Sequence, residues 1–232
     1  MKSNINCQDC PTHNACLWTG LQADTQEEIK KMLKVRYLPQ CGHTLFKMGD
    51  QFRSLYFIRS GSIKCSSINL EGEENVTRFG VSGDILGLNA VSSGTYDCTA
   101  TALEISSVCE MSYHAFQQLA NKTPQLNHRL LECMSREINH KERMMRLRGN
   151  TRAAVRLANF LSSISRDNGI RGYSTDAFYL SMRRCDIANY LGLALETVSR
   201  MFSQFQDTGM LRVDGKQIEI TDSKRLSALS GL

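Results

Sequence analysis

Residues 184–203, which read R-C-D-I-A-N-Y-L-G-L-A-L-E-T-V-S-R-M-F-S, constrain the fold more than any other stretch of this chain. Two short helices that cross need a small residue where they touch, here Ala188. They also need a residue that tolerates positive φ in the turn between them, here Gly192. Apolar side chains that can pin the second helix to the first stand at the required offsets: Ile187, Leu191, Leu193, Val198 and Met201. The segment therefore predicts a helix-turn-helix.

The second helix of this pair, expected over residues 195–206, carries a polar outer face. Four of its side chains are expected to project away from the core: Glu196, Thr197, Ser199 and Arg200. A Glu can accept a hydrogen bond from cytosine, an Arg can donate to guanine, and a Ser can serve either base or phosphate. This face predicts a recognition helix that contacts base edges of double-stranded DNA.

A hairpin signal follows the recognition helix. Residues 211–213 and 217–220 flank the sequence Asp-Gly-Lys, and Asp-Gly is a typical two-residue hairpin turn. A hairpin placed directly after a recognition helix forms a wing. Arg212 and Lys216 are expected to contact DNA phosphates from it.

The charge of the chain is distributed unevenly. The net charge is +5, but residues 1–120 carry 10 Lys and Arg against 12 Asp and Glu, whereas residues 121–232 carry 18 against 11. A basic second half and a mildly acidic first half indicate that only the second half meets nucleic acid.

Residues 37–111 have a different sequence pattern. Glycines recur about every ten residues and separate short apolar segments such as 55–58 and 62–65. This pattern is typical of a β-sandwich or roll. The last strand is expected over residues 104–111, and Ser112 is expected to cap a short helix after it.

Pro124, a suitable first-turn residue, opens a longer helix that is expected to end or bend near residue 149. One narrow stripe runs along it and consists of Leu126, Leu130, Met134, Ile138, Lys141 and Met145. Such a stripe on a helix between two domains often packs against its own copy, which predicts a homodimer. The alternative is that the stripe packs on the neighbouring roll.

Two shorter helices complete the predicted elements. One covers residues 25–34, where Thr25 and Glu28 have the spacing of a capping box. The other covers residues 153–163 and is followed by a polar loop over residues 166–174.

Three of the nine cysteines fall close together, at Cys7, Cys10 and Cys16. Soft thiolate sets of this kind select zinc, Cu(I) or an iron–sulfur cluster. The odd number of cysteines and the lack of an apolar signal peptide favour metal or redox chemistry over disulfides. A four-thiolate site needs one more ligand, and the pattern alone leaves Cys65, Cys98 and Cys109 open.

The composition excludes other classes. The sequence has no apolar run of about 18 residues, so no membrane association is expected and a cytoplasmic location is the default. No set of residues suggests turnover of a substrate, so the chain is not expected to be an enzyme.

The combined pattern resembles the cyclic-AMP receptor protein superfamily of bacterial transcription regulators, and within it the family of fumarate and nitrate reduction regulators. The resemblance covers nearly the whole chain. It rests on C-Q-D-C with its third cysteine, L-F-K-M-G-D, I-R-S-G-S-I-K, S-V-C-E and D-I-A-N-Y-L-G-L-x-x-E-T-V-S-R. It implies an α+β fold in which an N-terminal β-roll, like a cyclic-nucleotide-binding domain, is joined by a long dimerisation helix to a C-terminal winged helix-turn-helix. The corresponding parts are a cysteine-rich segment 1–20, the roll 21–121, the helix 122–149 and the DNA-binding domain 150–232.

The resemblance also implies a cofactor. The S-V-C-E cysteine of the family corresponds to Cys109, which would complete a [4Fe–4S] site with Cys7, Cys10 and Cys16. With the cluster, an oxygen sensor of this family dimerises and binds TTGAT-like inverted repeats, and oxygen destroys the cluster and switches binding off. Loops of the roll, including residues 73–78, are expected to touch RNA polymerase. The alternative is a zinc- or thiol-based redox regulator of the same fold without an iron–sulfur cluster.

Two departures from the superfamily pattern are informative. Relatives that bind cyclic AMP hold it with a Gly-Glu pair and an Arg before Ser or Thr. This chain has Gly87-Leu88 and Asp97-Cys98-Thr99 there, so we expect no cyclic nucleotide to bind. Lys141 lies on the expected dimer stripe, where like charges oppose pairing and favour a monomer when the cluster is absent.

Overall fold

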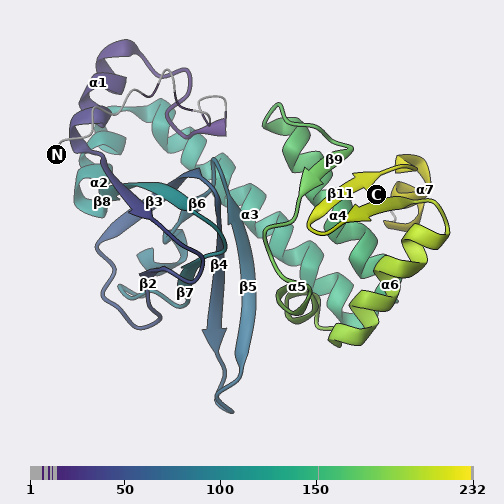
Figure 1. The fold of residues 1–232 in the computed structure, drawn as a ribbon. Coiled ribbons are helices and arrows are strands. Elements are labelled where there is room, and N and C mark those ends of the chain that lie inside the picture. The colour runs from purple at the N-terminus through teal and green to yellow at the C-terminus, as the bar shows by residue number, and fades with distance from the viewer. Residues whose placement is uncertain (1–6, 8–9, 11, 13–14, 151, 231–232) are drawn as a thin grey trace. The chain divides into compact units, whose positions relative to one another are not determined.

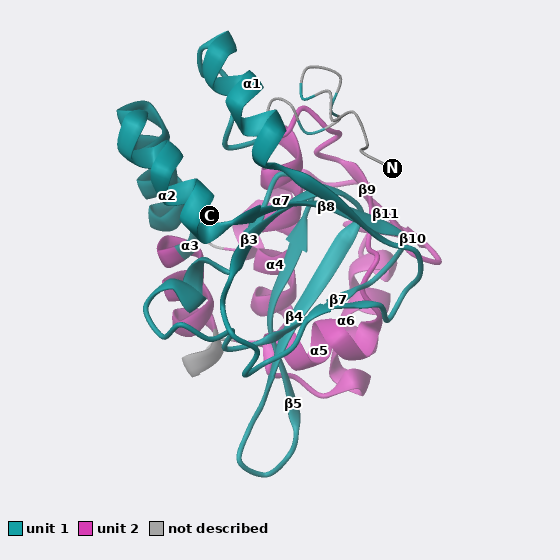
Figure 2. Cartoon of the chain, turned by 90° about the vertical axis from the view of Figure 1, so that its left-hand side faces the viewer, with its two compact units in different colours: residues 1–137 teal, residues 138–232 magenta. Residues whose placement is uncertain are grey.

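The computed structural model describes residues 7, 10, 12, 15–150 and 152–230. The chain forms two compact units, Met1–Glu137 and Ile138–Leu232 (Figures 1 and 2). The division falls inside one long helix, α3 (Pro124–Asn150), which begins at Pro124 as the sequence predicts.

Unit 1 is built on two four-stranded antiparallel sheets, which confirms the predicted β-roll. The first sheet has the order β1 (Lys34–Leu38), β8 (Ser106–Ser112), β3 (Ser54–Ser60) and β6 (Ile85–Leu86). The second has the order β2 (Thr44–Phe46), β7 (Thr99–Ala102), β4 (Ser62–Ile68) and β5 (Glu74–Val81). The strand expected over residues 104–111 is observed as β8.

The turn between β3 and β4 shows why a glycine punctuates this roll. Gly61 has φ +79°, and a Cβ there would lie 2.7 Å from the carbonyl oxygen of Ile105. Only glycine allows β4 to leave β3 at this point while Ser106 passes close by.

The remaining elements of unit 1 are α1 (Ala23–Met32), the short helix η2 (Leu88–Val91), α2 (Tyr113–Lys122) and the first part of α3. Ser112 caps α2 as predicted, because its Oγ accepts a hydrogen bond from the amide of Ala115 at 3.2 Å. The capping box predicted at Thr25 is wrong. Helix α1 begins two residues earlier with Gln22 as N-cap, and the side chain of Gln26 donates to the carbonyl of Leu21 at 2.9 Å.

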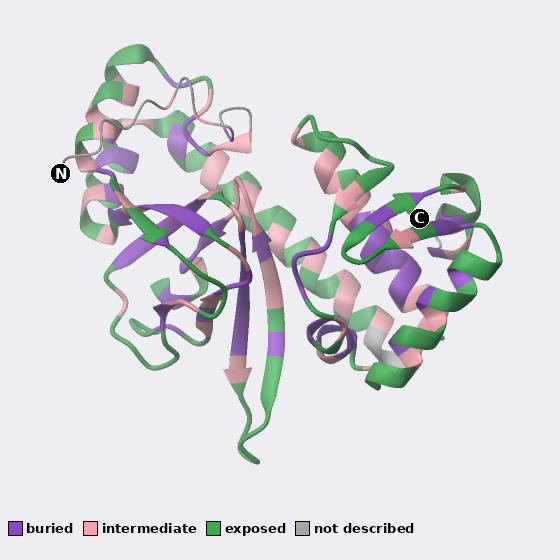
Figure 3. Cartoon of the chain, in the orientation of Figure 1, coloured by how far each residue is buried: buried purple, intermediate pink, exposed green. Residues whose placement is uncertain are grey.

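Two apolar cores stabilise unit 1. Figure 3 colours the buried residues of the chain purple. The first, the outer core, joins the end of the cysteine-rich segment to α1, α2 and the start of α3, and its members include Trp18, Ile29, Phe57, Cys109, Phe116 and Leu126. The second, the roll core, includes Leu38, Ile58, Ile63, Cys65, Tyr96, Cys98 and Val108. The cysteine-rich segment is therefore packed on the same core as the helix predicted to dimerise.

Unit 2 confirms the predicted winged helix-turn-helix. It contains α4 (Ala153–Ile170), β9 (Ala177–Tyr179), α5 (Arg184–Leu191), α6 (Leu195–Asp207), β10 (Leu211–Asp214), β11 (Gln217–Ile220) and α7 (Ser223–Ser230). The wing sheet has the order β10-β11-β9. Helix α4 runs seven residues beyond the predicted end at 163, so much of the predicted loop is helical. The buried residues of α4 end at Ser163, and the more polar turns after it carry no apolar pattern from which the extension could be predicted. Strand β9 was not predicted, since three residues carry too little periodicity.

Within the residues that the structure describes, none of the helices combines the length and the apolar character needed to cross a lipid bilayer.

Candidate metal site and nucleic-acid interface

Four cysteines line one cavity of unit 1. Cys7, Cys10 and Cys16 reach it from the amino-terminal segment, and Cys109 reaches it from β8. The rest of the lining consists of Thr12, Trp18, Thr19, Gln26, Leu33, Phe57, Ile58, Arg59 and Gly83. The two other cysteines that the sequence left open lie elsewhere, in the roll core. The fold thus brings Cys109, and not Cys65 or Cys98, to the three clustered cysteines.

Short turns position the thiols of the segment. The amide of Cys10 donates to the carbonyl of Cys7 at 3.4 Å, and the amide of Thr19 donates to the carbonyl of Cys16 at 3.1 Å. The Cys10 thiol and the Thr12 hydroxyl are hydrogen-bonded at 3.1 Å. These hydrogen bonds are local to the segment, and its three thiols face one cavity.

Trp18 anchors the segment beside the cavity. Its ring lies 4.6 Å from the ring of Phe57 and 6.3 Å from that of Phe116, measured between centroids. Phe57 is the direct cross-strand partner of Cys109 in the β3–β8 pair. The indole therefore connects the region next to Cys16 with the strand that supplies the fourth thiol.

Burial controls the protonation of these thiols. Loss of hydration is the largest cause that raises the pKa of Cys16 to about 12, that of Cys109 to about 11 and that of Cys7 above its usual value. The Arg59 guanidinium acts in the opposite direction on Cys7 and Cys109. Thiols with such pKa values are protonated at neutral pH, so binding of a metal must displace their protons.

The donor chemistry of the cavity fits a soft metal or an iron–sulfur cluster. Four thiols are its candidate ligands, and Arg59 supplies positive charge that offsets the negative charge of thiolates. Among the described residues, no three Cys, His, Asp or Glu side chains lie close enough together to form a preformed metal site. The four thiols share the cavity without converging on one point.

The helix-turn-helix is held by backbone and side-chain contacts in unit 2. Gly192 has φ +64° at the end of α5, and the amide of Leu193 donates to the carbonyl of Ala188 at 2.9 Å. Arg156 of α4 donates to the carbonyls of Leu191 and Gly192 at 3.1 and 3.2 Å. Sequence reasoning missed Arg156, because no local pattern shows that its guanidinium caps a helix 35 residues away.

The recognition helix α6 is amphipathic. Val198, Phe202 and Phe205 are buried against the rest of unit 2. The predicted contact residues occupy the opposite face, where Glu196, Ser199 and Arg200 are exposed and Thr197 is half-buried. This face is free to enter a DNA groove.

The two predicted wing residues have partners within the chain. Arg212 forms an ion pair with Glu219 on the next strand at 2.7 Å. The Lys216 ammonium donates to the carbonyl of Ser181 at 2.7 Å and lies 5.7 Å from the ring centroid of Tyr179. Contact with a phosphate would therefore require each cation to share or exchange its present partner.

Comparison with known proteins decides the family. Residues 155–229 match the Crp-like helix-turn-helix domain, and residues 39–123 match the cyclic nucleotide-binding domain. The chain is 41% identical to the fumarate and nitrate reduction regulatory protein of Salmonella typhimurium LT2 over 98% of this chain and 91% of that protein. The chain belongs to the fumarate and nitrate reduction regulator family. It is therefore a DNA-binding transcription regulator and not an enzyme, as the sequence predicts.

Other relatives agree with this family assignment. The transcriptional activator protein anr of Pseudomonas aeruginosa is 39% identical over 97% of this chain and 93% of that protein. Among solved structures, FixK2 from Bradyrhizobium japonicum superposes with a TM-score of 0.77 at 27% identity, covering 85% of this chain and 96% of that one.

The first turns of helix α3 pack inside unit 1, although the sequence predicts that they face a second chain. Leu126 is completely buried in the outer core, and Leu130 packs beside it. The expectation that Leu126 faces a second chain is therefore corrected, because the roll already covers it. Further along the helix, Met134, Ile138 and Met145 are exposed.

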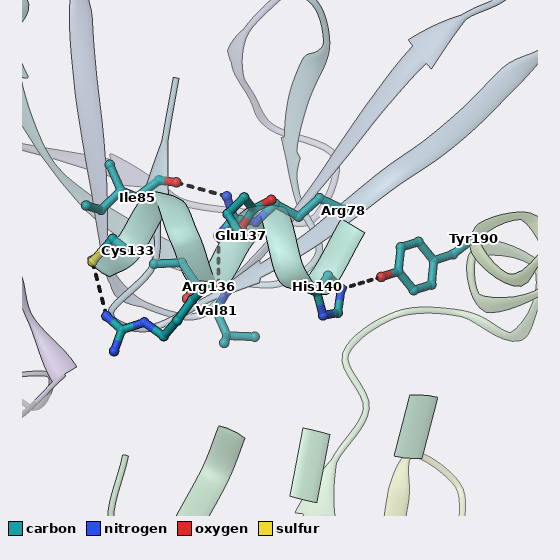
Figure 4. Close-up of polar contacts among 9 residues, drawn as sticks. Arg78, Val81, Ile85, Cys133, Arg136, Glu137, His140 and Tyr190 are labelled. Atoms are coloured by element: carbon teal, nitrogen blue, oxygen red, sulfur yellow. Dashed lines mark hydrogen bonds and ion pairs between the residues drawn. The ribbon is translucent and has the colours of Figure 1, made fainter. Parts of the chain in front are cut away.

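Polar contacts also hold the two halves of α3 (Figure 4). In unit 1, Arg78 pairs with Glu137 at 3.3 Å, and Arg136 donates to the Cys133 sulfur at 3.2 Å. In unit 2, the His140 imidazole is hydrogen-bonded to the Tyr190 hydroxyl of α5 at 2.8 Å. Each half of α3 is thus fixed to the unit in which it lies.

Proposed function

We propose that this chain is an oxygen-responsive regulator of anaerobic metabolism whose Cys7, Cys10, Cys16 and Cys109 hold a [4Fe–4S] cluster. The observation that carries the proposal is the single cavity lined by these four thiols. The names of the relatives, fumarate and nitrate reduction regulatory proteins, support the physiological role.

A bound iron–sulfur cluster supplies an oxygen-sensitive link between thiolates. The residues of the chain itself act by packing. Cys7, Cys10 and Cys16 keep the amino-terminal segment against β8, and Trp18 presses it onto the outer core, which also contains the first turns of α3. Ligation at the four thiols would therefore bias the position of α3, and we propose that α3 is the element that switches between two arrangements.

The exposed stripe of α3, Met134, Ile138 and Met145, is the surface that we propose pairs with a second copy of the chain. Lys141 is exposed on the same helix, and two such ammonium groups near a two-fold axis repel one another. This repulsion favours the monomer until ligation of the segment shifts the balance toward the dimer.

A dimer presents two α6 helices to half-sites about one DNA turn apart. We propose TTGAT-like inverted repeats as the operator, with Glu196, Ser199 and Arg200 contacting base edges and Arg212 and Lys216 contacting phosphates. A monomer makes about half of these contacts, so its affinity falls by orders of magnitude.

Two further features belong to the proposal. The tip between β4 and β5 is exposed at Glu73, which suits contact with RNA polymerase, whereas Arg78 at the other end of the predicted loop is half-buried. A cyclic nucleotide is not proposed as effector. Asp97, an acid, stands where relatives bind phosphate with Arg, and it accepts a hydrogen bond from Asn89.

The test is anaerobic purification followed by iron and sulfide analysis, an absorption spectrum, sedimentation and an operator-binding assay, each repeated after exposure to air. We expect about four irons and four sulfides per chain, a dimer and tight operator binding, all lost in air. Cys109→Ser should lose the cluster, and the matched variant Cys98→Ser should keep it. Operator binding that is indifferent to air would overturn the oxygen switch, and zinc without sulfide would favour a zinc- or thiol-based regulator.

A further inference from the structure

Arg78 of β5 joins three parts of unit 1 near the middle of α3 (Figure 4). Its guanidinium donates to the carbonyl of Ile85 at 3.0 Å and lies 3.5 Å from the Asp84 carboxylate. It also lies 3.3 Å from the carboxylate of Glu137 on α3. The side chains of Arg78 and Glu137 are 23% and 27% exposed, so solvent screens this pair less than an ion pair on the open surface.

The turn that carries Asp84 is fixed to the wall of the cysteine cavity. The Asp84 carboxylate accepts from the amide of Val81 at 3.0 Å, which closes the turn. The amide of Gly83 donates to the carbonyl of Ile58 at 2.8 Å, and the amide of Ile58 donates to the carbonyl of Asp84 at 2.9 Å. Ile58 and Gly83 both line the cavity.

The same turn touches the cysteine-rich segment. Gly83 has φ +95°, and a Cβ added there would lie 2.8 Å from the Cβ of Ala15. Such a distance is below van der Waals contact, so no other residue would fit without displacing the segment. Ala15 directly precedes Cys16, and its position therefore reports the position of that ligand.

We infer that Arg78 is a positioning residue, and that a relay of Ala15, Gly83, Asp84, Arg78 and Glu137 transmits the position of the cysteine-rich segment to α3. The inference rests on the proposed function, because it describes how that site controls the helix. Arg78 forms ion pairs with both Asp84 and Glu137. A shift of the turn that carries Asp84 therefore changes the strength of the ion pair with Glu137. A segment packed on Gly83 keeps Arg78 on Glu137, and a displaced segment loosens that pair.

The relay acts at a different place from the apolar contact. Trp18 and Leu126 share the outer core at the first turn of α3, whereas Glu137 lies about three turns further along. The relay reaches the part of α3 that bears the exposed stripe, where a small change of helix position alters pairing with a second chain.

Hydrogen exchange of α3 amides over residues 130–137 tests the relay. In the wild type, loss of the metal should speed this exchange at least about fivefold, the lower end of ordinary coupling between sites. In Arg78→Leu the exchange should already be fast and should no longer respond. Arg78→Lys should restore part of the response. The matched control is Arg36→Leu, which removes an ion pair between Arg36 on β1 and Glu110 on β8. Its exchange should respond to loss of the metal as that of the wild type does.

A second arm does not depend on the metal. In the metal-free protein, the larger side chain of Ala15→Leu should push the segment off Gly83 further than loss of the metal alone does. Exchange of the α3 amides should then be faster than in the metal-free wild type, but only while Arg78 is present. Iron and sulfide analysis of the wild type is made first, so failure of the proposed function is seen separately from failure of the relay. An Arg78→Leu protein that is folded by circular dichroism and responds like the wild type in both arms would overturn the inference.

Discussion

Trp18 is the residue whose replacement most directly tests how the cysteine-rich segment is held. Its side chain is only 4% exposed and contacts Phe57 and Phe116. A large aromatic side chain buries about 150–250 Å², which at about 25 cal/mol per Å² is worth about 4–6 kcal/mol. The alanine methyl stays buried and the unfolded chain already hides part of this area, so Trp18→Ala should lower the free energy of unfolding by about 3–5 kcal/mol.

The effect should be confined to unit 1. Urea denaturation followed by circular dichroism should show an earlier transition for unit 1 and an unchanged one for unit 2. Trp18 is the single tryptophan of the chain, so wild-type fluorescence follows unit 1 alone. Tyr37→Ala is the matched control, because Tyr37 is an aromatic residue of the same unit that is 65% exposed. It should change the stability by less than about 0.5 kcal/mol.

The reasoning is refuted if Trp18→Ala costs less than about 1 kcal/mol, a typical value for an average substitution. Wild-type emission at the wavelength of a fully hydrated indole would have the same meaning. Either result would show that the segment does not pack on the outer core in solution.

Three further predictions concern α3 and unit 2. Leu126→Ala should destabilise the monomer by about 2–5 kcal/mol, whereas Met145→Ala should leave its denaturation unchanged and weaken the dimer in sedimentation experiments. Arg156→Ala should lower the free energy of unfolding of unit 2 by about 1–3 kcal/mol, because two carbonyls at the end of α5 lose their donor. The control Arg152→Ala replaces an exposed residue at the start of α4 and should leave it unchanged. Arg200→Ala should weaken operator binding by about 1–3 kcal/mol and relax the preference at one base pair, measured with single-substitution operators.

Elements with local causes were predictable from the sequence. The helix-turn-helix depends on Ala188 and Gly192, which act within a few residues of themselves, and both are found in the predicted roles. Ser112 caps the next helix for the same reason. Local signals can also compete. Thr25 has the spacing of a cap, but Gln26 satisfies a carbonyl at the preceding turn, and α1 begins earlier.

Features that depend on long-range contacts were not predictable in this way. Cys109 reaches the cavity because β8 pairs with β3 and lies beside Phe57, a relation that spacing along the chain cannot show. Leu126 and Met145 belong to one helical stripe and differ in burial only because the roll covers the first of them. Arg78 was not singled out, since its partner Glu137 lies on a helix far along the chain.

The separation of Cys109 from the other three cysteines has a consequence for the unfolded state. Under the proposed function, a metal tie between Cys16 and Cys109 that persists in the unfolded chain would close a loop of about 90 residues, and a cross-link of that length removes about 4–5 kcal/mol of unfolded-chain entropy in the simplest model. A metal that dissociates on unfolding would stabilise unit 1 by a different route, because it binds only the folded state. Oxygen would then do more than stop transcription control, because unit 1 without its tie opens more often. Each opening exposes the backbone to proteases, so air would also shorten the lifetime of the protein.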